Sequence, residues 1–95
     1  MSDDKTRDPI DVAREVWGVP WQESTWIHNE RHHLLLRAEV RWFTVYVYVN
    51  ALVSPPRFDV EVRMALGGFD IHKTDLRAAL HTAKVATHRT LMDGA

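Results

Sequence analysis

Residues 32–50 read HHLLLRAEVRWFTVYVYVN, and apolar residues alternate with polar ones along this stretch, first on even and then on odd positions. Such alternation predicts strands of an antiparallel sheet. Its even positions from 34 to 42 are apolar, with charged residues at 37, 39 and 41, which is typical of a strand with one face in water. From Phe43 onward the apolar residues fall on odd positions. A strand cannot change faces by itself, so we expect either a β-bulge or bend near residues 41–43, or a second half that is apolar on both faces.

Further strands are predicted on both sides of this stretch. Residues 57–66, RFDVEVRMAL, have the most regular alternation in the chain and follow a loop at Ser54-Pro55-Pro56. Gly67-Gly68 is expected to end this strand. A weaker strand is predicted over residues 21–28, with a hairpin turn in the polar run at 29–31.

Helices are predicted at the two ends of the chain. The first covers residues 9–17, where Asp8 suits the capping position and Gly18 is expected to end the helix in a left-handed conformation. The second begins at Thr74 as its N-cap and runs to about Met92. Small apolar residues recur on one side of this second helix, which suits close packing on a sheet.

We therefore predict a small single α+β domain with the element order α-β-β-β-α. In it a three-stranded antiparallel sheet has both helices packed on one face. The domain is expected to cover residues 9–92. Residues 1–8 are expected to form a flexible polar N-terminal tail, and residues 93–95 a C-terminal tail.

Composition and charge exclude several classes of protein. The chain has no cysteine, which excludes disulfides, and a formal charge of −1 at pH 7 gives no overall attraction to nucleic acid or to an anionic membrane. The sequence contains no membrane-spanning run and no secretory signal, so we expect a cytoplasmic location. Nine Arg against three Lys suggest a GC-rich coding genome, such as that of an actinobacterium or one of its phages.

Candidate chemistry is sparse, and we predict no catalytic residue, cofactor, metal or small-molecule substrate. His28, His32 and His33 lie with Glu30 around the expected hairpin turn. These residue types suit Zn²⁺, but their spacing is not diagnostic, and clustered histidines at a turn are usually solvated. No hydroxyl lies in a strand-to-helix elbow, and no phosphate-binding glycine motif is complete. We therefore expect that the protein is not an enzyme.

The second half of this stretch, residues 42–49, is the predicted binding surface. It combines aliphatic and aromatic residues, and Trp, of which the chain has four, is the residue type most enriched at binding hot spots. We expect a non-catalytic protein-binding or regulatory domain that forms a homodimer or docks a protein partner through this strand. The alternatives are that a bulge sends both faces of the strand into one core, or that the loop at residues 51–56 folds over the second face. The predicted interface residues are Trp42, Phe43, Val45, Tyr46, Val47, Tyr48 and Val49.

A basic ridge on the second helix supports a different hypothesis, a nucleic-acid-binding domain. The ridge consists of Arg77, His81, Lys84 and His88, on the side opposite the apolar stripe, with Lys73 just before the helix. Such a ridge could follow a phosphate backbone. Such a ridge is also what the solvent-exposed face of an amphipathic helix usually looks like.

The predicted element order resembles that of the double-stranded-RNA-binding domain over residues 9–92. The resemblance implies binding to A-form RNA, with His32 near the histidine of that family's first hairpin loop and Lys73 near its lysines. The stretch GGFDIHKTDLRAAL, residues 67–80, stands where the family has tandem lysines, and the strand in 32–50 is longer than the family's. The order also resembles the secretion-chaperone-like fold, whose members dimerise and bind partner proteins through exposed apolar surfaces.

Overall fold

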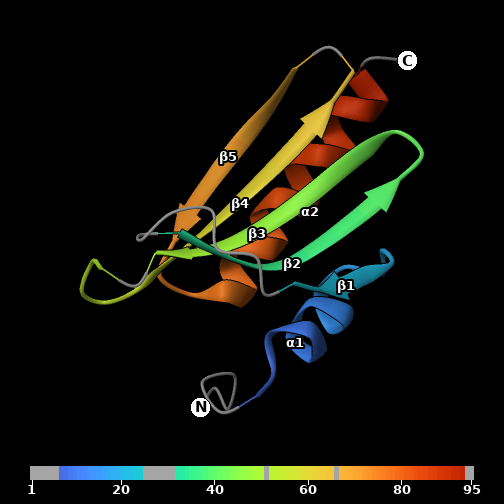
Figure 1. Ribbon diagram of the computed structural model, residues 1–95. Helices are drawn as coiled ribbons and strands as arrows, with labels where there is room; N and C mark the ends of the chain where they lie inside the picture. The colour runs from blue at the N-terminus through green and yellow to red at the C-terminus, as the bar shows by residue number, and fades with distance from the viewer. Residues whose placement is uncertain (1–6, 25–31, 51, 66, 94–95) are drawn as a thin grey trace.

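The computed structural model describes residues 7–24, 32–50, 52–65 and 67–93, and shows two helices on one face of a five-stranded antiparallel sheet (Figure 1). The elements are α1 (Pro9–Val16), β1 (Trp21–Glu23), β2 (His32–Val40), β3 (Phe43–Asn50), β4 (Arg57–Met64), β5 (Gly67–Lys73) and α2 (Leu76–Asp93). Each strand pairs with the next along the chain. The α+β class is confirmed, whereas the predicted three strands and the α-β-β-β-α order are wrong.

In residues 32–50 the switch of the apolar residues from even to odd positions marks a hairpin rather than a bulge or bend. The two-residue turn at Arg41 and Trp42 separates β2 from β3, and Val40 pairs with Phe43 across it. Because Val40 lies directly opposite Phe43, the even residues 36–40 of β2 and the odd residues 43–47 of β3 point to the same face. A bulge does occur, but between Leu34 and Leu36.

A second hairpin joins β4 to β5. Gly67 and Gly68 were expected to end the strand that begins at residue 57, but that strand ends at Met64 and the two glycines begin β5. Gly67 has φ +124°, a conformation that favours glycine at the start of the returning strand. A Cβ on Gly68 would lie 2.1 Å from the Val62 carbonyl oxygen, so only glycine fits this close approach. The two glycines thus permit the strand to return.

The termini of the helices differ in detail from the prediction. Asp75, not Thr74, caps α2, because its Oδ2 accepts a hydrogen bond from the backbone N–H of Ala78 (3.2 Å). At the end of α1, Trp17 adopts an extended conformation (φ −142°), and Gly18 does not have the left-handed conformation that was expected. In the described part of the chain, neither helix combines the length and apolar character needed to cross a bilayer.

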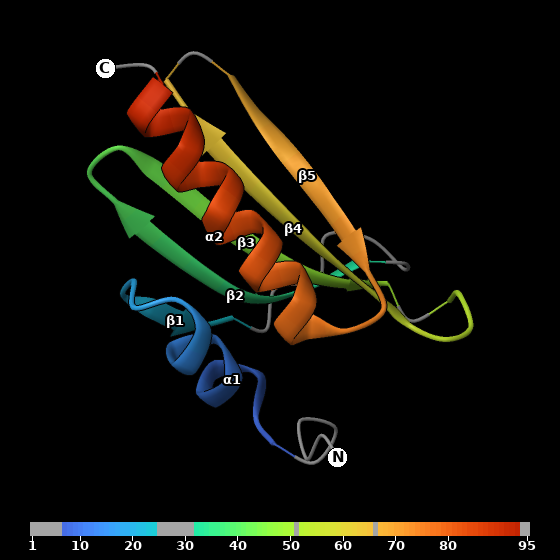
Figure 2. The same ribbon diagram turned by 180° about the vertical axis from the view of Figure 1, so that it is seen from behind.

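The core lies between the two helices and the face of the sheet that they cover (Figure 2). Trp17 is its centre at the α1 side, since its ring stacks on Phe43 (5.5 Å between centroids) and meets the edge of Trp21 (6.1 Å). The Trp21 indole N–H donates to the Trp17 carbonyl oxygen (2.8 Å). The remaining core residues are Ile10, Val12, Ala13, Leu36, Ala38, Val45, Val47, Val60, Val62, Leu76, Ala79, Leu80 and Ala83.

One polar group in this core has no hydrogen-bond partner among the described residues, the hydroxyl of the fully buried Thr87 on α2. Such a group carries its desolvation cost without compensation. Replacing it with the isosteric Thr87→Val should raise the free energy of unfolding by about 1 kcal/mol, measured by urea denaturation. The matched control is Thr90→Val on the same helix, because Thr90 is exposed and its hydroxyl already donates to the Ala86 carbonyl. A gain for Thr90→Val but none for Thr87→Val would contradict this account.

Candidate functional site

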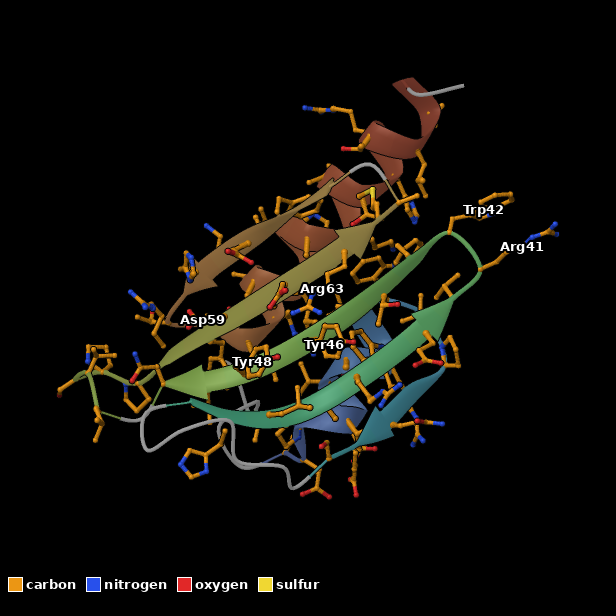
Figure 3. The ribbon with its side chains drawn as sticks, turned by 45° about the horizontal axis from the view of Figure 1, so that its top comes forward. Arg41, Trp42, Tyr46, Tyr48, Asp59 and Arg63 are labelled. Atoms are coloured by element: carbon orange, nitrogen blue, oxygen red, sulfur yellow. The ribbon has the colours of Figure 1, made fainter. Side chains whose placement is uncertain are left out.

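The face of the sheet opposite the helices, the open face, is the candidate site. Alternation along β3 divides the predicted interface between the two faces. Phe43, Val45 and Val47 are at most 7% exposed and lie in the core, so a partner cannot reach them in the folded domain. Tyr46 and Tyr48 point to the open face and are partly exposed (Figure 3).

Tyr46 and Tyr48 form the aromatic centre of the open face. Their rings stack at 6.3 Å between centroids with an interplanar angle of 27°. The Arg63 guanidinium from β4 lies 5.0 Å from the Tyr46 centroid, and it also donates to Glu61 next to it. Two aromatic rings and a guanidinium thus lie in contact in one row, and Tyr and Arg are among the residue types most enriched at binding hot spots.

Charges of both signs surround the two tyrosines. The strand register places Glu61 opposite Tyr46 and Asp59 opposite Tyr48, with Arg63 opposite Thr44. The acidic residues of the open face are Glu39, Asp59, Glu61 and Asp70, and the basic ones are Arg37, Arg57 and Arg63. All three guanidiniums form ion pairs with neighbouring carboxylates. The open face therefore carries charges of both signs rather than a continuous positive charge.

The sheet also brings together a histidine and a carboxylate that are distant in sequence. Asp59 is 8% exposed, and its Oδ1 contacts His72 Nδ1 (2.7 Å) and accepts from Arg57 Nε (3.0 Å). The carboxylate therefore holds the imidazole in one orientation with Nε2 on the far side of the ring. Among the described residues, no three metal-ligating side chains gather closely enough to bind a metal ion.

The tip of the β2–β3 hairpin carries the most exposed aromatic residue of the described chain. Trp42 is 63% exposed, and the Arg41 guanidinium lies 4.9 Å from its ring centroid. Both side chains extend beyond the end of the sheet, apart from the two tyrosines (Figure 3). Trp42 is thus the one member of the predicted interface that is largely solvent-exposed.

The predicted basic ridge mostly contacts α1. Arg77 donates to Glu15 (3.0 Å), and Lys84 donates to the Val16 carbonyl oxygen at the end of α1 (3.2 Å). The His88 ring meets the edge of Trp17, with 6.3 Å between centroids. His81 and Lys73 are exposed, but three of the five predicted side chains serve to attach α1 to α2.

The histidine cluster that was weighed as a metal site falls mainly outside the described residues. This applies to His28 and Glu30, and the side chain of His32 is not described either. His33 lies on β2 opposite Val49. The prediction that these residues hold no metal stays a prediction.

Comparison of the chain with protein-family models, curated proteins and solved structures found no match in any of the three. The candidate site consequently rests on the geometry of the open face. Asp59, His72 and Arg63 were not recognised from the sequence as one group with the tyrosines. Their alternation was visible, but the β3–β4–β5 register that joins them requires both hairpins.

The open face perturbs the ionisation of Tyr48. Burial raises the pKa of its phenol, and the nearby Glu61 carboxylate raises it further. In a Tyr46→Phe variant Tyr48 is the only tyrosine, and its absorbance change at 295 nm should have a midpoint above the ordinary value of about 10. Because the unfolded chain loses this proton first, stability should fall as the pH rises through that value. A midpoint at or below 10 would contradict the described burial.

The attachment of α1 to α2 can be tested through Glu15. Hydrogen bonds from Arg7 and then from Arg77 lower the pKa of its carboxyl group. Arg77→Ala should move that pKa upward toward its ordinary value, measured from the pH dependence of the side-chain carboxyl ¹³C shift. The control Arg89→Ala removes an exposed cation from the same helix and should leave the Glu15 midpoint unchanged. Equal midpoints in both variants would disprove the contact.

Proposed function

We propose that this chain is a non-catalytic protein-binding domain, with a regulatory role in the cytoplasm, that docks a partner protein on the open face of the sheet. The observation that carries the proposal is the stacked pair of Tyr46 and Tyr48 with Arg63 against it. Both helices of the described residues lie on the other face of the sheet (Figures 1 and 2). Aromatic rings fixed by their neighbours lose little conformational entropy on binding.

The charges of the open face favour a protein over a nucleic acid. Nucleic-acid interfaces need cations that are free to neutralise phosphates. On this face four carboxylates accompany three guanidiniums that already form ion pairs. A surface with charges of both signs around an aromatic centre suits a protein with complementary charges around an exposed aromatic, proline or arginine side chain.

The basic ridge supports the alternative only weakly. Arg77 and Lys84 contact α1, which leaves Lys73, His81 and His88 as the exposed cationic or titratable members of the ridge. The three-stranded order that resembled the double-stranded-RNA-binding domain is also replaced by five strands. Duplex RNA or DNA should therefore show no salt-dependent retardation by this protein in a gel at low ionic strength.

Site-specific photocrosslinking tests the proposed docking face. A benzophenone amino acid replaces Tyr48 on the open face or, as a matched control, Val85, which is 42% exposed on the outer side of α2. In the host cell, a partner should be crosslinked from position 48 and not from position 85. With the purified partner, Tyr46→Ala/Tyr48→Ala should weaken binding at least about 30-fold, as expected for a hot spot worth about 2 kcal/mol.

Two outcomes would contradict the proposal. One is a partner crosslinked from position 85 alone, which would place the interface on the helical side. The other is a partner whose affinity is unchanged by the double tyrosine substitution while circular dichroism shows a folded domain. A second control, Thr44→Ala, removes a side chain at the margin of the open face and should change the affinity for the partner by less than about threefold.

A further inference from the structure

The two edges of the sheet differ in a way that bears on assembly. At one edge, β1 has only three residues and follows Pro20, so it offers little backbone for pairing. At the other edge, β5 has seven residues, all in continuous register with β4. No strand in the described residues pairs with the outer side of β5. Half of its N–H and C=O groups therefore point outward, ready for another strand.

An acidic residue on β5 lacks a cationic partner. Asp70 is exposed and lies directly opposite Glu61 of β4, so two carboxylates occupy one cross-strand pair. Like charges in this arrangement are destabilising. Glu61 is paired with Arg63, whereas Asp70 has no ion pair within the described chain. A cation supplied from the outer side would relieve this repulsion.

A residue of the same strand can supply that cation. His72 contacts Asp59 through Nδ1, and this contact orients the ring. Nε2 takes no part in it. Its side chain is 49% exposed and lies on the same face as Asp70, two residues along the strand. The edge therefore carries a carboxylate and an imidazole in positions that an antiparallel copy of itself would match.

We propose that β5 pairs with the β5 strand of a second copy of this chain, antiparallel about a two-fold axis through Ile71. In this register Asp70 lies opposite the partner's His72, and the reciprocal pair forms by symmetry. Ile71 meets the partner's Ile71 on the helix-covered face, where its side chain is only partly buried in the single chain. The two sheets become one sheet with five strands from each chain.

Charge selects this register over the neighbouring one. A two-fold axis through Asp70 would align all seven residues, but it would place Asp70 directly opposite the partner's Asp70. The axis through Ile71 avoids this cost. This edge is separate from the tyrosines of the open face, so dimerisation does not depend on the proposed docking function.

The pairing requires a proton on His72. Asp59 on β4 accepts from Nδ1, so a hydrogen bond from Nε2 to the partner's Asp70 needs the imidazolium form. The charged groups that face this ring are Asp59, the Arg57 guanidinium bound to Asp59, and the carboxylates of the two Asp70 residues. The imidazolium then donates from both ring nitrogens, to Asp59 and to the partner's Asp70.

Sedimentation equilibrium of the full chain over a concentration series tests the proposal. Asp70→Lys should raise the dimer dissociation constant at least about tenfold, because it reverses both symmetric pairs. It should not unfold the chain, since it places a cation opposite Glu61. His72→Lys supplies a permanent cation opposite the partner's Asp70 and should keep the dimer. The control Glu23→Lys makes the same charge reversal on β1, the opposite edge, and should leave dimerisation unchanged.

Hydrogen exchange locates the interface independently. Backbone amides of residues 68–73 should become more protected as protein concentration rises, and the amides of β1 should not. A chain that stays monomeric up to about 1 mM would overturn the proposal. So would a dimer that Asp70→Lys leaves intact, or one whose β5 amides exchange at a rate independent of concentration.

Discussion

The turn at Arg41 and Trp42 determines which side of the sheet every later side chain occupies. By pairing Val40 with Phe43, it sends Phe43, Val45 and Val47 into the core and Tyr46 and Tyr48 to the open face. The register then passes from β3 to β4 and from β4 to β5 without a shift. A turn longer or shorter by one residue would reverse these faces, because strand side chains alternate with a period of two.

Some of the fold could be predicted because its signals are local. The two helices follow from spacing and capping residues, and the alternating stretches mark where strands lie. The β2–β3 turn was missed since no described residue except glycine has a positive φ, so Arg41 and Trp42 need neither Gly nor Asn. Strand β5 was missed because a Gly-Gly pair usually ends a strand. Here Gly68 serves the close approach to Val62.

The candidate site was predictable only in part, for a similar reason. Its tyrosines stand out in the sequence, but alternation alone did not separate them from Phe43, Val45 and Val47 while the turn was unknown. The group of Asp59 and His72 depends on a register across a hairpin that had not been foreseen. The basic ridge shows the opposite case, because a pattern that suits phosphate binding is used to hold α1 through Arg77 and Lys84.

The shortness of β1 has a consequence for how many chains can join. A sheet with two long edges could add copies at both ends and grow into a fibre. In the proposed dimer the β5 edge is used once, by a two-fold pairing, and the outer strand at each end of the joined sheet is β1, with three residues. In that dimer growth would stop at two chains, so the same asymmetry that exposes one edge would also make the assembly finite.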